Sequence, residues 1–147
     1  MPSLLFVCLG NICRSPAADG IAQSLSKQRG LDWRIDSAGT GAWHVGKTPD
    51  ERMMMAAAAR GMDLSPLRAR QAEPDDFFRF DHIFAMDETN LADLEQIRPA
   101  GAIASLSLFL EQGDVPDPYY GGTDGFEHVL DLISARMETL FNRLQQD

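Results

Sequence analysis

Cysteine is scarce in this sequence. The 147 residues contain two, Cys8 and Cys13, and both lie in one short stretch near the start. Two cysteines cannot build a disulfide scaffold, and two alone make a poor zinc site. The three histidines, His44, His82 and His128, are too scattered to supply metal-ligand spacing. We therefore expect a cytoplasmic protein, held in a reducing compartment, that needs no metal or other cofactor.

Basic residues are fewer than acidic ones, 13 against 22, and the chain has no long apolar run. The formal net charge is −9, which argues against a general nucleic-acid binder because such proteins present a basic face to phosphates. No apolar run approaches the roughly 20 residues of a membrane span. The first residues also carry no basic segment of the kind that opens a signal peptide. We expect no nucleic-acid partner and no membrane anchor.

Short apolar segments alternate with segments of helical periodicity along the chain. The expected strands are residues 3–8, 33–39, 82–86 and 102–109. The expected helices are residues 15 to about 29, 48 to about 60, 87–97 and 123 to about 145. Strands separated by helices imply right-handed crossovers and a parallel sheet. We predict a three-layer α/β fold, a doubly wound four-stranded parallel sheet with helices on both faces, as a single domain over residues 1–147.

Two of the expected helices begin with capping signals. Ser15 followed by Pro16 predicts an N-cap and a first helical position. Thr48, with Pro49 after it and Glu51 three residues on, predicts a capping box. The run at 73–81, by contrast, is interpreted as a segment whose acidic residues are exposed for solubility.

The predicted sheet indicates where a ligand site should lie. In open parallel sheets, ligands bind at the carboxyl ends of the strands. The stretch VCLGNICRSP, residues 7–16, lies at that end because it follows the first strand. The loops at 39–48, 87–90 and 114–122 follow the other strands and should converge on it.

The residues of this stretch suit a loop that holds an oxyanion. Gly10 permits backbone angles that a side chain forbids, and Asn11 tolerates the left-handed region. Successive backbone N–H groups then form an anion nest, and the following helix points its positive end at it. Arg14 adds a planar fork for two phosphate oxygens. The residues expected to bind phosphate or another oxyanion are Leu9, Gly10, Asn11, Ile12, Cys13, Arg14 and Ser15.

Cys8 is expected to be a thiolate and a nucleophile. The helix end, the nest, Arg14 and the Ser15 hydroxyl all favour the sulfur anion over the thiol. The thiolate can then attack a bound phosphoryl group without a histidine base. The nest and Arg14 stabilise the charge of the transition state. The alternative is a buried thiol that precedes a turn.

Thiolate attack on a phosphate ester expels an alkoxide or phenoxide, which needs a proton donor. Asp117 and Asp114 are both candidates in the loop after the fourth strand, and we favour Asp117, which lies between two prolines. In a second step the same group would activate water as a base. Tyr119, Tyr120 and Trp43 are candidate walls for an aromatic leaving group. The alternatives are a packed loop for the tyrosines and a half-buried anchor for the tryptophan.

Together these residues resemble the low-molecular-weight protein tyrosine phosphatases. The resemblance rests on residues 8–16 and 117–120, and residues 36–53, 68–71 and 86–91 agree with it, so it spans nearly the whole chain. It implies a flavodoxin-like, phosphotyrosine phosphatase I-like fold. It also implies metal-free, two-step hydrolysis of phosphotyrosine and aryl phosphate monoesters through a cysteinyl-phosphate. The partners it implies are phosphotyrosyl proteins, and the expected state is a monomer or weak self-association.

The resemblance carries each role over to a matching position. It implies the following: Cys8 as nucleophile, Arg14 as phosphate clamp, Asp117 as acid and base, Asn11 and Ser15 as braces of the loop, and Trp43, Tyr119 and Tyr120 as pocket walls. The tryptophan makes the chain more similar to the eukaryotic-type branch than to the bacterial branch tied to exopolysaccharide tyrosine kinases.

Two positions add expectations of their own. In the family, Cys13 can pair with Cys8 under oxidants, which predicts reversible inactivation by peroxide; the alternative is a small buried residue. Leu67 stands where members often carry a histidine near the phosphate loop. Bracing of Asn11 and Ser15 therefore needs another source.

Three other functions fit the sequence less well. Thiol-linked arsenate reductases resemble this family but need cysteines beyond Cys8 and Cys13. Phosphoarginine phosphatases commonly have threonine where Ile12 stands. A non-catalytic phosphate-binding module needs neither the thiol nor the acid. We therefore expect a phosphatase that acts on aryl phosphates.

Overall fold

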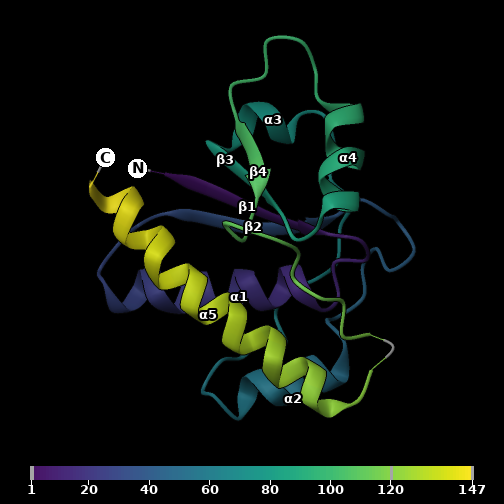
Figure 1. Cartoon of the computed structure of the whole chain (residues 1–147), viewed down its shortest axis with the longest axis vertical. Helices are drawn as coiled ribbons and strands as arrows, with labels where there is room; N and C mark the ends of the chain where they lie inside the picture. The colour runs from purple at the N-terminus through teal and green to yellow at the C-terminus, as the bar shows by residue number, and fades with distance from the viewer. Residues whose placement is uncertain (1, 120, 147) are drawn as a thin grey trace.

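A four-stranded parallel sheet lies at the centre of the computed structural model, which describes residues 2–119 and 121–146 (Figure 1). Its strands are β1 (Ser3–Cys8), β2 (Arg34–Gly39), β3 (His82–Ala85) and β4 (Ser105–Leu108). They are ordered β2-β1-β3-β4, and every neighbouring pair is parallel. All four carboxyl ends therefore lie at one edge of the sheet.

Helices cover both faces of the sheet. One face carries α1 (Arg14–Gln28), α2 (Glu51–Ala58) and α5 (Thr123–Gln146), and the other carries α3 (Asp76–Arg79) and α4 (Glu88–Ile97) (Figure 1). This confirms the predicted three-layer, doubly wound α/β fold. Among the described residues, no helix has both the length and the apolar character needed to cross a membrane.

The central strand β1 is buried on both faces. Leu4 and Phe6 pack into the core beneath α1 and α5, whereas Leu5 and Val7 pack into the core beneath α3 and α4. All four side chains are inaccessible to solvent. A strand covered on both sides has no polar face, which explains its continuous apolar sequence. Its carboxyl end delivers Cys8 to the edge of the sheet.

Both predicted helix caps are wrong in position. Helix α1 begins at Arg14 with Cys13 as its N-cap residue, so Ser15 and Pro16 lie inside the first turn. Pro16 is tolerated there because the first N–H groups of a helix have no partner within it. The N-cap of α2 is Asp50, whose side chain accepts hydrogen bonds from the backbone of Arg52 and Met53.

Two predictions in the second half of the chain also need correction. The strand expected at 102–109 is shortened to β4, because Ile103 and Ala104 donate backbone hydrogen bonds to Phe77 rather than to the sheet. The acidic run at 73–81 is not a purely solvated segment, since it contains α3, and Asp76 is 1 % exposed. Ion pairs with arginines allow this carboxylate to be buried.

Candidate active site

The loop between β1 and α1 lines one side of a pocket, and neighbouring segments hold its backbone. Asn11 has a left-handed backbone with φ of 56°. The carbonyl oxygens of Cys8, Leu9 and Ile12 accept backbone hydrogen bonds from the surrounding loops, at 2.9, 2.9 and 2.7 Å. Because a trans peptide points its N–H opposite to its C=O, these bonds direct the next N–H groups to the other side of the loop. The result is the row of donors that an oxyanion requires.

A glycine at the end of β2 lets the loop pack closely. A Cβ atom on Gly39 would lie 2.8 Å from the carbonyl oxygen of Leu9 and 3.2 Å from the amide nitrogen of Asn11. Any side chain at this position would push the loop outward. The close approach also allows the backbone of Thr40 and Gly41 to bind the loop carbonyls.

The Cys8 sulfur lies at the base of the loop, against a chain of polar side chains. Its Sγ atom is 3.0 Å from the hydroxyl oxygen of Ser15. Asn11 Nδ2 donates to the same Ser15 oxygen at 2.8 Å, and Asn11 Oδ1 accepts from the backbone N–H of Arg70 at 3.0 Å. Since Asn11 donates to Ser15, the Ser15 hydrogen can point to Cys8 Sγ or to the carbonyl of Ala38, 3.3 Å away.

Arg14 is buried beside this sulfur and is oriented from one side. Its Nη1 donates to Asp87 Oδ2 at 2.6 Å and to the carbonyl oxygen of Val115 at 3.0 Å. Its Nη2 lies 3.6 Å from Asp117 Oδ2. Burial lowers the pKa of Arg14, but the charges of Cys8, Asp87 and Asp117 raise it above its ordinary value. The guanidinium therefore stays charged although it is 3 % exposed.

The two candidate acids point to different places. Asp117 lines the pocket, and its Oδ1 accepts a hydrogen bond from the backbone of Tyr119 at 3.1 Å. Asp114 Oδ1 instead accepts from the backbone of Glu88 at 3.0 Å, at the start of α4. The position of Asp114 is explained by this helix terminus, and Asp117 is the carboxylate that faces Arg14.

These groups open into a pocket of about 280 Å³. Trp43 and Leu9 stand at its rim with 69 % and 40 % of their surface exposed. The rings of His44 and Tyr119 are tilted toward each other, with centroids 6.5 Å apart. The pocket is lined by Cys8, Leu9, Gly10, Ile12, Cys13, Arg14, Trp43, His44, Asp117 and Tyr119.

The second cysteine of the loop has different chemistry. Cys13 is free, and burial raises the pKa of its thiol far above the usual range, with the Asp50 charge adding to the effect. Cys13 is therefore a neutral thiol at pH 7, unlike a residue that serves as a nucleophile. The tie from the Asp50 backbone to the Ile12 carbonyl keeps this side of the loop against α2.

Comparison with known proteins decides the family. A family profile described as low molecular weight phosphotyrosine protein phosphatase matches residues 3–147. The chain belongs to this family. It is accordingly a protein-tyrosine phosphatase, a hydrolase of phosphoric monoesters.

Several relatives of this phosphatase cover most of its length. The low molecular weight phosphotyrosine protein phosphatase of Schizosaccharomyces pombe is 46% identical over 132 residues, with 84% of each chain covered. A protein tyrosine phosphatase of Entamoeba histolytica superposes with a TM-score of 0.93 at 36% identity, covering 99% of this chain and 98% of the other. A drosophila arginine phosphatase superposes equally well, at 32% identity and with 100% and 99% covered. The resemblance and the fold predicted from the sequence are confirmed.

The phosphatase brings together the loops that the sequence predicted to converge. Cys8, Arg14, Trp43, Asp117 and Tyr119 come from three segments, residues 7–16, 39–48 and 114–122, and line one pocket. The loop at 87–90 does not line the pocket but contributes Asp87, which contacts Arg14. Asn11 and Ser15 do not line the pocket; Ser15 contacts the Cys8 sulfur, and Asn11 contacts Ser15. Tyr120 lies outside the described residues.

Three residues of this site, His44, Arg52 and Arg70, are not among those predicted from the sequence. His44 lines the pocket, and its position directly after Trp43 in a converging loop was a usable signal. Arg52 donates to the Tyr119 carbonyl at 2.9 Å, and Arg70 braces Asn11, but neither had a local sequence signal. Leu67, in place of the family's usual histidine, packs against the apolar core beside α1. The bracing of Asn11 therefore comes from Arg70.

Proposed function

We propose that the phosphatase hydrolyses phosphotyrosine and aryl phosphate monoesters through a cysteinyl-phosphate on Cys8. One observation carries this proposal: the Cys8 sulfur, the Arg14 guanidinium and the Asp117 carboxylate line the same pocket of about 280 Å³. A nucleophile, an oxyanion clamp and a proton donor are the three groups that this reaction needs.

In the first step, the loop N–H groups and Arg14 bind the phosphoryl oxygens. The Cys8 thiolate attacks phosphorus while the bond from phosphorus to the aryl oxygen breaks. Asp117 gives its proton to the departing oxygen, so the leaving group departs as a phenol. The Ser15 hydroxyl, 3.0 Å from Cys8 Sγ, stabilises the sulfur anion before the attack.

In the second step, the Asp117 carboxylate takes a proton from water as that water attacks phosphorus. The sulfur–phosphorus bond breaks, inorganic phosphate leaves, and the Cys8 thiolate is restored. Asp117 regains the proton that it gave up, so the cycle is balanced. The partly exposed side chain of Asp117 supports this role, because water must reach it.

The walls of the pocket favour a flat aromatic group. Ile12, Trp43 and Tyr119 present apolar and aromatic surface beside the thiol. The physiological substrates proposed on this basis are phosphotyrosyl proteins of the cytoplasm, with the enzyme acting as a monomer or in weak self-association. Phosphoarginine is the second candidate, because a drosophila arginine phosphatase superposes with a TM-score of 0.93.

The test compares hydrolysis of an aryl phosphate and of phosphoarginine, with a chelator present, in wild type and three variants. Turnover of the aryl phosphate should vanish in Cys8→Ser and fall about a hundredfold in Asp117→Asn. Asp114→Asn is the matched control and should stay within roughly threefold of wild type, since its carboxylate faces α4.

Other outcomes would change the assignment. Faster hydrolysis of phosphoarginine than of the aryl phosphate would move the substrate class to the second candidate. Tight binding of phosphate or vanadate, with no turnover of either substrate, would leave a phosphate-binding module.

A further inference from the structure

We propose that Arg70 is a positioning residue that holds the phosphate loop in its anion-binding shape and keeps the Ser15 hydroxyl directed at Cys8. The inference rests on the proposed function, in which that loop binds phosphate and Cys8 attacks it. Arg70 lies outside the pocket and touches neither the sulfur nor a substrate. Its effect is exerted through Asn11, Ser15 and the end of β2.

The backbone of Arg70 fixes the orientation of the Asn11 amide. An N–H group can only donate, so its 3.0 Å contact must be with the amide oxygen of Asn11. The amide nitrogen is then left to donate to Ser15 at 2.8 Å. Ser15 accepts from Asn11 in this arrangement and keeps its own hydrogen, which can be donated to Cys8 Sγ at 3.0 Å or to the Ala38 carbonyl at 3.3 Å. Reversal of the Asn11 amide would break the contact with the Arg70 N–H group and would make Ser15 the donor to the amide oxygen, so the Ser15 hydrogen would no longer be available to Cys8.

The segment that presents this N–H group is not part of a helix or of the main sheet. It is joined to the end of β2 by two backbone hydrogen bonds, from Gly39 to the Arg70 carbonyl at 2.8 Å and from Ala72 to the Gly39 carbonyl at 2.7 Å. Two more backbone hydrogen bonds join Ala69 to Gly46 and Lys47, at 2.8 and 2.9 Å. All of these bonds lie on the side of β2 and the loop after it, and the side chain of Arg70 adds the link to α3.

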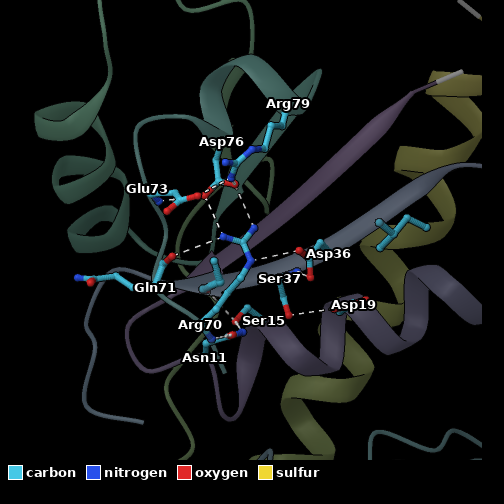
Figure 2. A network of polar contacts seen from close by, with 12 residues as sticks. Asn11, Ser15, Asp19, Asp36, Ser37, Arg70, Gln71, Glu73, Asp76 and Arg79 are labelled. Atoms are coloured by element: carbon cyan, nitrogen blue, oxygen red, sulfur yellow. Dashed lines mark hydrogen bonds and ion pairs between the residues drawn. The ribbon is translucent and has the colours of Figure 1, made fainter. Parts of the chain in front are cut away.

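That side chain joins three parts of the fold. Its Nη1 and Nη2 donate to the two carboxylate oxygens of Asp76 in α3, both at 3.1 Å, and its Nε donates to Asp36 in β2 at 3.2 Å. Figure 2 shows the guanidinium between these two carboxylates, with Asn11 and Ser15 on the opposite side of the Arg70 backbone. Since Asp76 is buried, release of Arg70 would leave a buried charge poorly paired. This cost keeps the Arg70 side chain bound to Asp76.

A second arginine in the same cluster provides a matched control. Arg79 also contacts Asp76, at 3.4 Å, and pairs with Glu73 and Asp75 on the surface. It contacts neither β2 nor the phosphate loop in any interaction found among the described residues. Loss of Arg79 thus perturbs Asp76 without releasing the Arg70 segment.

The experiment measures vanadate affinity and the pH dependence of Cys8 alkylation by iodoacetamide, with the modified cysteine located by peptide mapping. In Arg70→Met, vanadate binding should weaken about tenfold or more, since small displacements at a site are costly. The alkylation midpoint should move to higher pH by about half a unit or more. Arg79→Met should stay within roughly twofold of wild type in affinity.

Comparison of the alkylation midpoints of wild type and the variants isolates the effect of the Arg70 side chain. The other ionisable groups around the sulfur, Cys13, Arg14, His44 and Asp117, line the same pocket and stay unchanged in every variant. Unchanged vanadate affinity and an unchanged alkylation midpoint in Arg70→Met would overturn the proposal. So would equal losses in Arg70→Met and Arg79→Met, because these would reflect Asp76 alone.

Two milder variants decide the matter if Arg70→Met does not fold. Arg70→Lys keeps a positive charge beside Asp76 but cannot hold Asp36 and Asp76 together, and Asp36→Asn removes one partly exposed partner. Both should show the same shifts at smaller size, and wild-type values in both would overturn the proposal. Neither readout needs turnover. If the wild-type protein had no phosphatase activity, the proposed function would be refuted. The vanadate and alkylation measurements would still test the role of Arg70.

Discussion

Two arginines stand on opposite sides of the phosphate loop, each between two carboxylates, and they are held in different ways. Arg14, on the pocket side, has Nη1 fixed by Asp87 and the Val115 carbonyl, whereas Nη2 lies 3.6 Å from Asp117, beyond hydrogen-bond distance. Arg70, behind the loop, uses both terminal nitrogens on Asp76 and its Nε on Asp36.

The difference separates an arginine that can bind a ligand from one that cannot. Arg14 is oriented by Nη1, and its Nη2 makes no hydrogen bond found among the described residues, so in the proposed mechanism Nη2 binds a phosphoryl oxygen. Arg70 has its fork fully occupied, so its contribution is rigidity. In our proposal, the same pairing of residue types therefore supports substrate binding by Arg14 on one side of the loop and positioning by Arg70 on the other.

The largest effect should come from the pocket side. Arg14→Lys keeps the charge but loses the planar fork, and kcat/KM for an aryl phosphate should fall about a thousandfold, as with loss of an oxyanion donor. Steady-state kinetics beside Arg70→Lys checks this directly. If Arg70→Lys cost as much as Arg14→Lys, the distinction between the two arginines would fail.

The next largest effect is on the free energy of unfolding and comes from Asp19, a buried carboxylate of α1. Asp19 is buried, and burial raises its pKa from 3.8 to about 6 even though Ser37 and Gln23 donate to it. Between about pH 4 and pH 6 the unfolded chain releases this proton before the folded chain does, so wild-type stability falls as pH rises. The variant Asp19→Asn should not show this fall in stability, because its side chain does not titrate.

Urea unfolding at several pH values measures the difference. Relative to wild type, Asp19→Asn should gain about 2 to 3 kcal/mol of unfolding free energy between pH 4 and pH 7, from the size of the pKa shift. The exposed carboxylate variant Asp32→Asn is the control and should follow the wild-type curve. Parallel curves for Asp19→Asn and wild type would show that the buried carboxyl is not the titrating group.

A smaller effect is expected from the partner that orients Arg14. Asp87→Asn removes the charge at 2.6 Å from Nη1 but keeps an oxygen that can cap α4. Arg14 retains the Val115 carbonyl, so kcat/KM should fall only about tenfold, as for a modest loss of positioning. A loss as large as that of Arg14→Lys would mean that Asp87 is needed for more than orientation.

The sequence was most informative where a residue acts through its neighbours in the chain. The strand before Cys8 and the spacing to Arg14 placed both groups correctly, because the loop is built from consecutive residues. Helix starts were less secure. Ser15 has the composition of an N-cap, but its hydroxyl is used by Cys8 and Asn11 instead, and the helix begins earlier.

Contacts between distant segments had no local signal. Asp76 lies in an acidic run that resembles a solvated surface, and its burial depends on the guanidinium groups of Arg70 and Arg79 and on the backbone N–H of Glu73. Similarly, Asp114 and Asp117 were equally acidic in sequence, and the start of α4 is what distinguishes them. Such pairings depend on which elements the fold brings together.

The most direct test of the two-step mechanism is a search for the covalent intermediate. Asp117→Asn is mixed with p-nitrophenyl phosphate, whose leaving group needs little help from an acid, then quenched in acid and analysed by mass spectrometry. Without Asp117 as base, the second step should slow, and a phosphoryl group should accumulate on Cys8. Continued release of p-nitrophenol by this variant with no phosphoryl group on Cys8 would contradict the mechanism.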